Sequence, residues 1–458
     1  HRIAGECFLV KLSNFNLVFP FNHKYDVVFN SLYGSLVLVD KEVGAAIRNG
    51  NLDLLVSDRE IYNQLKSANI ILDDDVDEKE VYYKVSREFR FNNKAIIMFL
   101  GLTSKCNLAC RYCYQSLRKT IDGADLTEDK WRIIRGFLER RVREGYELIA
   151  IALYGGEPLL NPRMARRVID DIDELSRKHG VQKEIMLITN GTILNREVEE
   201  IVNRVDAIQV TIDGPRVIHD ERRPFKNNGG SFEVITSNLI KLVGEYDKYV
   251  GVRVNVDEHN VDYIKELVDY LLEVDVGRRL GTIDFSPVHP DQADIYNPLK
   301  TSKSFLEYYT RVSRRIVDTV EYAVERGFKV GKMFIKGPCM CKYVTGYAVD
   351  ENLNIYMCPA YMYTQPIGKI ISDRIIAMDP GRYKPITSDP DCTRNCKYAP
   401  ICYGGCIYLQ HKNIPTCLRV IYGDEYLEKL IRAYIISTYG NTIVDKESLN
   451  YVHEKVIR

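Results

Sequence analysis

Between residues 95 and 327 the chain alternates short apolar runs with longer segments in which apolar residues recur at helical spacing. The first run, AIIMFLGL, is almost continuously apolar, as expected of a strand that is covered on both faces. An amphipathic segment follows each of the six runs, which predicts six β–α units. We predict the strands at 95–102, 148–155, 184–189, 207–213, 250–256 and 282–288, and the helices at 127–145, 162–180, 196–205, 232–245, 261–274 and 305–327.

Six consecutive β–α units predict an α/β fold built on a parallel sheet. Six units fit a partial (β/α)6 barrel of the TIM type better than a closed barrel of eight units. We assign this partial barrel to residues 95–330.

The segment before the barrel, residues 1–94, has a different pattern. Three short strands are predicted at 16–21, 25–30 and 35–40, followed by helices at 41–50, 58–68 and 77–89. This order indicates a small α+β module.

The segment after the barrel, residues 331–458, is rich in cysteine and is interrupted by proline and glycine as far as Cys417. We expect no regular pattern there until two helices in the tail from Tyr422 to Arg458. We treat it as a third, C-terminal domain.

Composition narrows the class of protein only a little. The 458 residues allow two or three domains, and 63 basic residues balance 63 acidic ones. The overall charge therefore suggests neither a nucleic acid nor an anionic membrane as a partner. No apolar run is long enough to span a bilayer, and no signal peptide is recognisable, so we expect a cytoplasmic location.

Cysteine is the unusual component: eleven of the twelve lie in two groups, three at 106–113 and eight at 339–417. Without a secretory signal, metal binding is a better explanation than disulfides. The first group, in SKCNLACRYCYQ, has the spacing C-x3-C-x2-C. A tetrahedral zinc ion or a four-iron cluster needs four ligands, and no fourth Cys or His follows nearby. One coordination position is therefore vacant, unless a distant His completes a zinc site.

Polar residues follow every predicted strand of the barrel. They stand in YGGEP (154–158), TNG (189–191), TIDG (211–214), at Arg253 and Asn255, and in SPVH (286–289). The carboxyl ends of parallel strands meet at one rim, where reactive groups gather in barrels of this type. The cysteine triad follows the first strand and falls on the same rim.

This set of residues resembles the radical S-adenosylmethionine (SAM) enzymes. Their cysteine signature stands here as Cys106, Cys110 and Cys113, with an aromatic residue, Tyr112, before the last cysteine, and GGEP is their second signature. The resemblance implies that three thiolates hold a [4Fe–4S] cluster whose fourth iron binds SAM through its amino and carboxylate groups. An electron, from a donor such as ferredoxin or flavodoxin, then cleaves SAM to a 5′-deoxyadenosyl radical that abstracts hydrogen from the substrate.

The same resemblance implies further contacts to SAM. Gly155 and Gly156 would let the backbone approach the methionine ammonium, and Glu157 would offset its charge. Arg223 would pair with the SAM carboxylate, although its neighbour Arg222 is an equally basic alternative. The implied SAM-binding residues are Tyr112, Gly155, Gly156, Glu157, Pro158, Asn190, Thr211 and Arg223.

The second cysteine group resembles the SPASM extension, which carries two auxiliary [4Fe–4S] clusters in a subgroup of radical SAM enzymes. The resemblance rests on CTRNCKYAPICYGGC. It implies a first auxiliary cluster on Cys339, Cys341, Cys358 and Cys406, and a second on Cys392, Cys396, Cys402 and Cys417. Two zinc sites are the alternative.

The chain departs from the SPASM pattern in three ways. Cys392 and Cys396 are one residue further apart than usual, and Leu353 stands at a turn position where the family often has glycine. Cys339 and Cys341 are only two residues apart, so one of them need not ligate, which would leave an open iron.

The resemblance implies a peptide or protein as substrate, because SPASM enzymes act mostly on these. The enzymes that mature ribosomally made peptides often carry an N-terminal module of strands and helices that binds a leader peptide, and residues 1–94 have that element order. A lid over the barrel is the alternative role for this module. Sulfatase-maturing enzymes place an Asp that acts as a general base immediately after the third cysteine of the extension. This chain has Pro359 at that position.

We therefore expect a peptide crosslink or oxidation, with no catalytic base identified. Formylglycine formation and a small substrate such as a haem precursor remain alternatives. A non-catalytic iron–sulfur carrier and a zinc-stabilised binding protein are the rivals from other classes.

Overall fold

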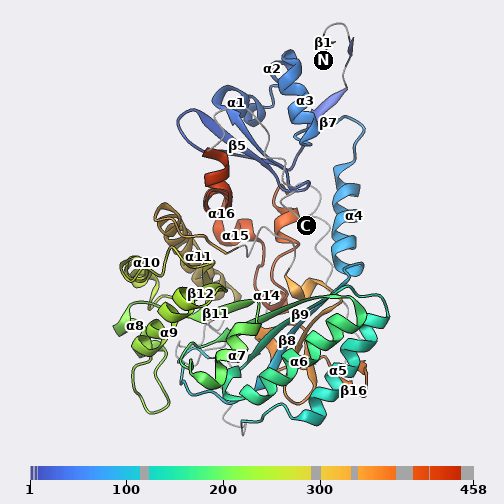
Figure 1. Ribbon diagram of the computed structural model, residues 1–458. Helices are drawn as coiled ribbons and strands as arrows, with labels where there is room; N and C mark the ends of the chain where they lie inside the picture. Colours follow the sequence, from blue (N-terminus) through green and yellow to red (C-terminus); the bar gives the residue numbers. More distant parts are fainter. Residues whose placement is uncertain are drawn as a thin grey trace.

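A ten-stranded sheet forms the centre of the computed structural model, which describes residues 2–3, 6–7, 9–113, 123–289, 301–331, 339–377, 396–411 and 413–444 (Figure 1). The strand order is β13-β12-β11-β10-β9-β8-β14-β15-β16-β17. Six neighbouring strands are parallel and in chain order, as predicted. They are β8 (Ala95–Thr103), β9 (Leu148–Gly155), β10 (Gln182–Thr189), β11 (Ala207–Thr211), β12 (Tyr249–Val256) and β13 (Thr282–Pro287).

The predicted helices are also present. They are α5 (Glu128–Arg143), α6 (Pro162–His179), α7 (Arg196–Arg204), α9 (Phe232–Glu245), α10 (Ile264–Glu273) and α11 (Ser302–Glu325). Caps define their ends: the Thr127 side chain accepts a hydrogen bond from Lys130 N before α5, and Gly180 ends α6 in the left-handed conformation. The prediction of an α/β fold around a parallel sheet is confirmed.

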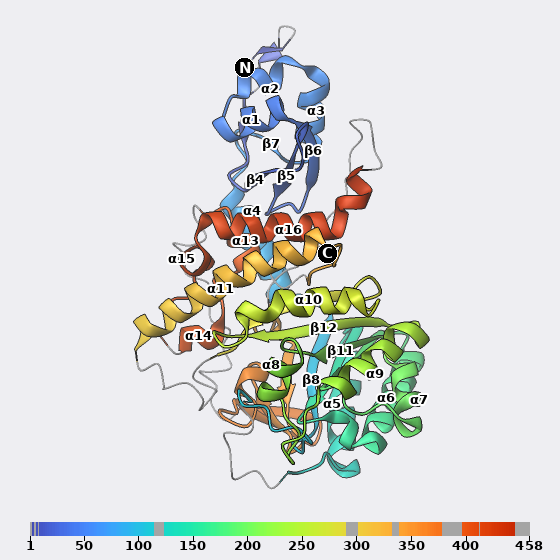
Figure 2. The same cartoon turned by 90° about the vertical axis from the view of Figure 1, so that its left-hand side faces the viewer.

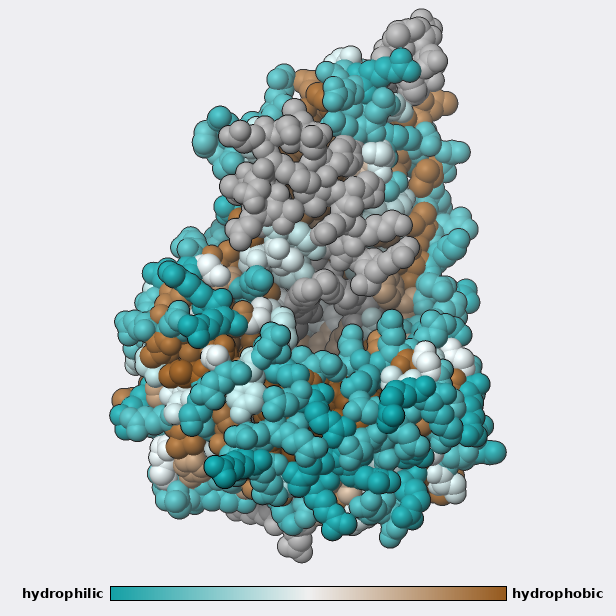
Figure 3. Space-filling model, in the orientation of Figure 1, coloured by the Kyte–Doolittle hydropathy of each residue, from teal (hydrophilic) through white to brown (hydrophobic). Residues whose placement is uncertain are grey.

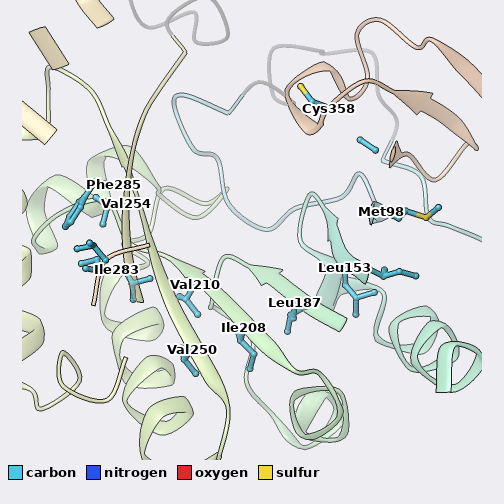
Figure 4. Close-up of a cluster of buried hydrophobic side chains, with 14 of the residues drawn as sticks. Met98, Leu153, Leu187, Ile208, Val210, Val250, Val254, Ile283, Phe285 and Cys358 are labelled. Carbon is cyan, nitrogen blue, oxygen red and sulfur yellow. The ribbon is translucent and has the colours of Figure 1, made fainter. Parts of the chain in front are cut away.

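Apolar side chains from neighbouring strands form the core between sheet and helices (Figure 4). Leu153, Val210 and Val254 are fully buried there. The surface of the helices that cross one face of the sheet, α5 to α7, is mostly hydrophilic (Figure 3). This division of polar and apolar residues is what the amphipathic segments predict.

Two regions differ from the sequence prediction. The loop after β11 contains a helix, α8 (Arg216–Arg222), and the cysteine-rich segment contains four strands. These are β14 (Gly346–Val349), β15 (Asn354–Tyr356), β16 (Gly368–Ile371) and β17 (Arg374–Ala377). Strands of three or four residues are too short for a readable period, and they gain stability by extending the sheet from β8. β14 pairs with β8 in parallel, and the other three are antiparallel.

The N-terminal module has its own hydrophobic core. Its three predicted strands form an antiparallel sheet of order β4-β5-β6, and α2 and a second pair, β3–β7, were not predicted. The elements are β1 (Arg2–Ile3), β2 (Glu6–Cys7), β3 (Val10–Leu12), β4 (Asn16–Pro20), β5 (Tyr25–Asn30), β6 (Leu36–Asp40), α1 (Lys41–Asn49), α2 (Leu52–Ser57), α3 (Arg59–Ser67), β7 (Ile71–Asp73) and α4 (Glu78–Phe91).

The module rests on the C-terminal part of the chain. Ser31 Oγ donates a hydrogen bond to Lys397 O at 2.6 Å, and Arg432 Nε donates to Pro20 O at 3.0 Å. Helix α16 (Asp424–Val444) runs beside α11, between the module and the sheet (Figure 2). It accounts for one of the two helices predicted in the tail, and the other falls outside the described residues. No helix in the described ranges has the length and apolarity to cross a membrane.

Candidate active site at the carboxyl edge of the sheet

The three cysteines of the first group lie on the loop that leaves β8. Backbone hydrogen bonds tie this loop to the end of α8 and the segment after it: Ala109 N donates to Pro224 O at 2.8 Å, and Arg111 N donates to Arg222 O at 3.0 Å. Cys113 N closes a turn on Cys110 O at 3.1 Å. The loop is therefore fixed by the protein's own backbone along one side.

The glycine pair of GGEP holds the other side of the loop. Gly156 N donates to Thr103 O, and Glu157 N donates to Lys105 O, each at 2.8 Å. A Cβ atom on Gly156 would lie 2.1 Å from Lys105 O, and one on Gly155, whose φ is 126°, would lie 2.2 Å from Thr103 O. Glycine is thus required here for the close approach of two backbones. A contact of these glycines with the SAM ammonium stays a prediction.

Glu157 joins the ends of β9 and β10. Its fully buried carboxylate accepts hydrogen bonds from Asn190 N (2.7 Å), Thr189 Oγ1 (2.8 Å) and Leu159 N (3.1 Å). Burial raises the pKa of Glu157, and these donors act against that rise. All described hydrogen-bond partners of its carboxylate belong to the protein itself, so its direct role is to hold the ends of the strands together. Pro158 opens the short 3-10 helix that follows.

Asn190 extends this support to the cysteine loop. Its Nδ2 donates to Asn107 Oδ1 at 2.8 Å and lies 3.8 Å from Cys106 Sγ. Thr211, which ends β11, is buried at the same edge of the sheet. Both residues are on the predicted rim, but Asn190 is engaged with the protein itself.

Tyr112 is the centre of a buried polar network. Its hydroxyl contacts Asp213 and accepts hydrogen bonds from Arg223 Nη1 at 2.6 Å and Asn255 Nδ2 at 3.1 Å. The Arg222 guanidinium carbon lies 5.0 Å from the centre of the Tyr112 ring. This network joins the cysteine loop to β11 and β12.

The structure separates the roles of the two neighbouring arginines. Arg222 binds Asp257 Oδ2 through Nη1 at 2.5 Å and Asn255 O through Nη2 at 3.2 Å. Arg223 makes one side-chain hydrogen bond among the described residues, to Tyr112, and its Nη1 lies 4.0 Å from Asp213 Oδ2. The buried Nε of each arginine has no hydrogen-bond partner in the described part of the chain. Burial alone would lower the pKa of Arg223, but its charged neighbours, Cys110 foremost, favour the cation and raise that pKa. Arg223 is therefore the arginine with donors to spare beside the cysteines.

His219 and Ser231 fix the backbone of Arg223. Asp213 N donates to His219 Nδ1 at 3.2 Å, so the ring proton is on Nε2, which donates to Ser231 Oγ at 3.1 Å. Ser231 Oγ donates in turn to Arg223 O at 2.6 Å. Burial lowers the pKa of His219 well below its usual value, so the ring is neutral. No sequence pattern indicated these hydrogen bonds, because they depend on the unpredicted helix α8.

The side chains around the first cysteine group fit an iron–sulfur cluster. Burial raises the pKa of the Cys110 thiol to about 12, so the thiolate form requires a positive partner. Iron supplies that charge when it binds thiolates, and the unused Arg223 donors suit a carboxylate. The three cysteines form no disulfide and share one loop.

The described later cysteines lie in two groups, while their assignment to two auxiliary clusters stays a prediction. Cys341 lies beside Cys358 and Cys406, with its Sγ 3.2 Å from Cys339 Sγ. Cys402 lies beside Cys396 and Cys417, and Cys392 falls outside the described residues. Among the residues that the structure describes, no three Cys, His, Asp or Glu side chains are already arranged around a single ion.

Lys342 stands among both of these groups. Its Nζ is buried and has no hydrogen-bond partner in the described part of the chain. Burial lowers the pKa of Lys342, and the neighbouring Cys341, Cys402 and Cys406 act against this. An unpaired buried cation fits a place beside an anionic cluster.

The segment around Cys358 contains a hydrogen-bonded tyrosine–carboxylate pair. Pro359 opens a short 3-10 helix and cannot accept a proton. Tyr363, with a left-handed φ of 66°, donates a hydrogen bond to Glu351 Oε2 at 3.1 Å. Burial raises the pKa of Glu351. Sequence reasoning missed Glu351, which lies in the segment predicted to be irregular.

Residues 100–271 match the Radical SAM superfamily. This match, together with the cysteine loop and the fold, shows that the chain contains a radical SAM domain. Members of this family bind SAM and a [4Fe–4S] cluster, so these two cofactors follow from the family. The expectation from the cysteine and GGEP signatures is confirmed at this level.

Two characterised relatives match more of the chain. A cysteine-type anaerobic sulfatase-maturating enzyme of Clostridium novyi is 23% identical over 339 residues, which cover 69% of this chain and 88% of the relative. The radical SAM cyclopropyl synthase TigE of Paramaledivibacter caminithermalis is 20% identical over 335 residues, 66% of each chain.

The fold is also found in a solved structure, that of anSMEcpe with bound AdoMet. It has 18% sequence identity and a TM-score of 0.53, and the match covers 76% of this chain and 98% of that one. At this identity the likeness concerns the fold alone.

Proposed function

We propose that this enzyme modifies a side chain of a peptide or protein, by crosslinking or oxidation, with a SPASM domain that holds two auxiliary [4Fe–4S] clusters. The gathering of the described later cysteines into two groups is the observation that carries the proposal. The similarity to a sulfatase-maturating enzyme, which extends well beyond residues 100–271, supports it.

In this proposal Cys106, Cys110 and Cys113 hold the cluster, and Arg223 faces the SAM carboxylate. When bound, cluster and SAM supply a 5′-deoxyadenosyl radical that removes hydrogen from the substrate. Glu157 and Asn190 keep the cysteine loop in place, because they bind its backbone and side chains from β9 and β10.

The proposed division of the chain is residues 1–94, 95–330 and 331–458. The first is a module that binds the leader segment of the substrate, the second holds SAM, and the third holds the auxiliary clusters. We place the enzyme in the cytoplasm, with a ferredoxin or flavodoxin as electron donor. No described strand pairs with the outer edge of β6, which supports peptide binding over a lid.

Anaerobic reconstitution tests the proposal. Three four-iron clusters correspond to about twelve irons and about twelve sulfides per chain, and dithionite with SAM should release 5′-deoxyadenosine. The triple variant C106A/C110A/C113A should lose about four irons and all SAM cleavage. Zinc without iron, or a fully loaded chain that leaves SAM intact, would contradict the proposal.

Formylglycine formation is the second candidate, favoured by the Clostridium novyi relative. Pro359 at the position of the expected base argues against it, although the hydrogen-bonded Glu351–Tyr363 pair could substitute for that base. A synthetic cysteine peptide incubated with the reduced enzyme and SAM decides between them: a hydrazide-reactive aldehyde on the peptide would establish formylglycine formation.

A further inference from the structure

Five aromatic side chains form a continuous row that begins at the carboxyl edge of the sheet and ends at the protein surface. Their order is Tyr309, His289, Tyr408, Tyr361 and His411. Neighbouring ring centres along this row lie 5.7, 4.9, 5.0 and 5.8 Å apart, so each ring is in contact with the next. We call this set the aromatic row.

The aromatic row connects the parallel sheet to the cysteine-rich segment. His289 follows β13, and Tyr309 belongs to α11. Tyr361 ends a short 3-10 helix, and Tyr408 belongs to α14 (Ile407–His411). Side chains from parts of the chain that are far apart in the sequence therefore meet in one file.

The inner end of the row lies beside the candidate active site. Val288 N, next to His289, donates a hydrogen bond to Val256 O at the end of β12 at 2.8 Å. Asn255, on the same strand, donates to the hydroxyl of Tyr112 in the cysteine loop. The row thus begins next to the strand that contacts this loop.

Each end of the row pairs a phenol with an imidazole. The Tyr361 hydroxyl lies 2.8 Å from His411 Nδ1, and the Tyr309 hydroxyl is hydrogen-bonded to His289 Nδ1. The phenol is the donor when the ring nitrogen carries no proton. Imidazole can then take over the phenol proton completely.

A neighbouring tyrosine shows that packing alone does not require this arrangement. The buried hydroxyl of Tyr308 donates to Val288 O at 3.1 Å. A backbone carbonyl satisfies a buried phenol but cannot act as its base. Because a tyrosine that loses an electron also loses its phenol proton, the two imidazoles suit Tyr309 and Tyr361 to reversible one-electron oxidation.

Only the outer end of the row is open to solution. Tyr309 is 3% exposed, and Tyr408 and Tyr361 are each 4% exposed. His289 is partly buried, whereas His411 is exposed. Electrons and protons can therefore be exchanged with solution beside His411, while the three phenols are shielded.

We propose that the aromatic row is a protective path, which quenches a carbon radical at the carboxyl edge of the sheet when no substrate consumes it. The inference rests on the proposed function, because that radical is the one made from SAM. The radical gains one electron from Tyr309 and one proton from solvent, which together complete a C–H bond. The phenol proton of Tyr309 moves to His289 Nδ1.

The oxidation then ends near the surface. Tyr408 passes an electron from Tyr361 to Tyr309, and the proton returns from His289. Tyr361 is left as a neutral phenoxyl radical, and its proton rests on His411 Nδ1. A thiol in solution supplies the missing electron and releases its own proton, while His411 returns the phenol proton. Two oxidised thiols pair as a disulfide.

A single turnover of the reconstituted chain, without peptide, tests this path. A single electron equivalent of dithionite is supplied, SAM is added, and the sample is frozen within seconds. We expect electron paramagnetic resonance to show a tyrosyl radical in the parent chain. Y361F/Y408F keeps both rings but removes both phenols, and it should lose most of this signal. Covalent deoxyadenosyl adducts on the protein, counted by mass spectrometry per 5′-deoxyadenosine released, should rise at least about fivefold in that variant.

Control variants separate the row from its surroundings. Y347F/Y434F removes two equally buried phenols outside the row and should behave like the parent chain. H411Q, at the exposed end, keeps a hydrogen-bond acceptor but removes the base, so it should shorten the lifetime of the tyrosyl signal roughly tenfold. H411Q decides the question if Y361F/Y408F fails to fold, and an unchanged lifetime would count against the row.

A second test needs no SAM. The same preparation, oxidised by light with ruthenium tris(bipyridine) and persulfate, should carry the radical on Tyr361, although Tyr249 is 49% exposed and Tyr263 is 42% exposed. The signal should therefore persist in Y249F/Y263F and fall in Y361F/Y408F.

The outcomes separate this inference from the proposed function. A light-driven signal that is lost in Y249F/Y263F but kept in Y361F/Y408F, or adduct yields that Y361F/Y408F leaves unchanged, would overturn the inference. Release of 5′-deoxyadenosine would still stand for the enzyme. A chain that forms the radical on Tyr361 by light but cannot cleave SAM would support the row and contradict the enzyme proposal.

Discussion

The two cysteine regions of this enzyme are built in different ways. The loop of Cys106 is hydrogen-bonded to the end of β9 on one side and to the end of α8 and the segment after it on the other, so the protein's own backbone supports its shape. The described later cysteines lie in short helices, at their ends or in turns. Leu353 and Tyr403 nearby are in left-handed conformations, and Lys342 is buried without a hydrogen-bond partner among the described residues. The first region is preorganised, and the second depends more on what it binds.

Removing cysteines should separate the two regions most strongly. The triple variant C106A/C110A/C113A should lose SAM cleavage entirely but keep its resistance to protease, because backbone bonds hold its loop. C402A/C417A should be cleaved roughly tenfold faster near residues 396–417, because that segment loses its organising metal. Product analysis and timed proteolysis with mass spectrometry measure both effects. Equal resistance to protease in the two variants would contradict the proposed difference between the two cysteine regions.

The two adjacent arginines are also expected to differ in role, one in stabilising the fold and the other in binding SAM. R222Q leaves the buried Asp257 carboxylate without its ion pair and should cost about 3–5 kcal/mol of stability. R223Q should leave the fold largely intact and weaken SAM binding by roughly tenfold or more, with partial recovery in R223K. Thermal unfolding and equilibrium SAM binding of the reconstituted enzyme distinguish them. The reverse pattern would show that Arg222 faces SAM.

Lys342 offers a test confined to the second region. K342M removes a buried cation near both later cysteine groups and should make the reduction potential of an auxiliary cluster more negative. A shift of roughly 60 mV corresponds to a tenfold change in the one-electron reduction equilibrium of that cluster. Potentiometric titration followed by electron paramagnetic resonance measures this, and the SAM-binding cluster serves as internal control. An unchanged potential would place Lys342 outside the influence of the clusters.

Backbone strain provides the smallest effect. Ser372, in the exposed turn between β16 and β17, has a φ of 59°, which glycine adopts without steric cost. S372G should therefore stabilise the chain by about 1 kcal/mol. Thermal unfolding of S372G beside the parent chain measures the gain. A loss of stability would mean that chain entropy in the unfolded state outweighs the relieved strain.

Sequence patterns predicted the barrel well because its strands are continuous apolar runs and its helices are amphipathic and capped. They missed β14 to β17, since strands of three or four residues are defined by their partners rather than by their own period. They also could not choose between Arg222 and Arg223, which are identical in type and adjacent. Only the positions of Asp257 and Tyr112 around them distinguish the two.

The parallel pairing of β14 with β8 has a further consequence for anyone who wishes to shorten this protein. A fragment that stops at residue 331 would expose the whole flank of β8, from Ile97 to Leu100, to other chains. Exposed apolar flanks of this kind join one another and precipitate. The cysteine-rich C-terminal part therefore covers the edge of β8 in the catalytic part, and the two parts should be produced and studied as one chain.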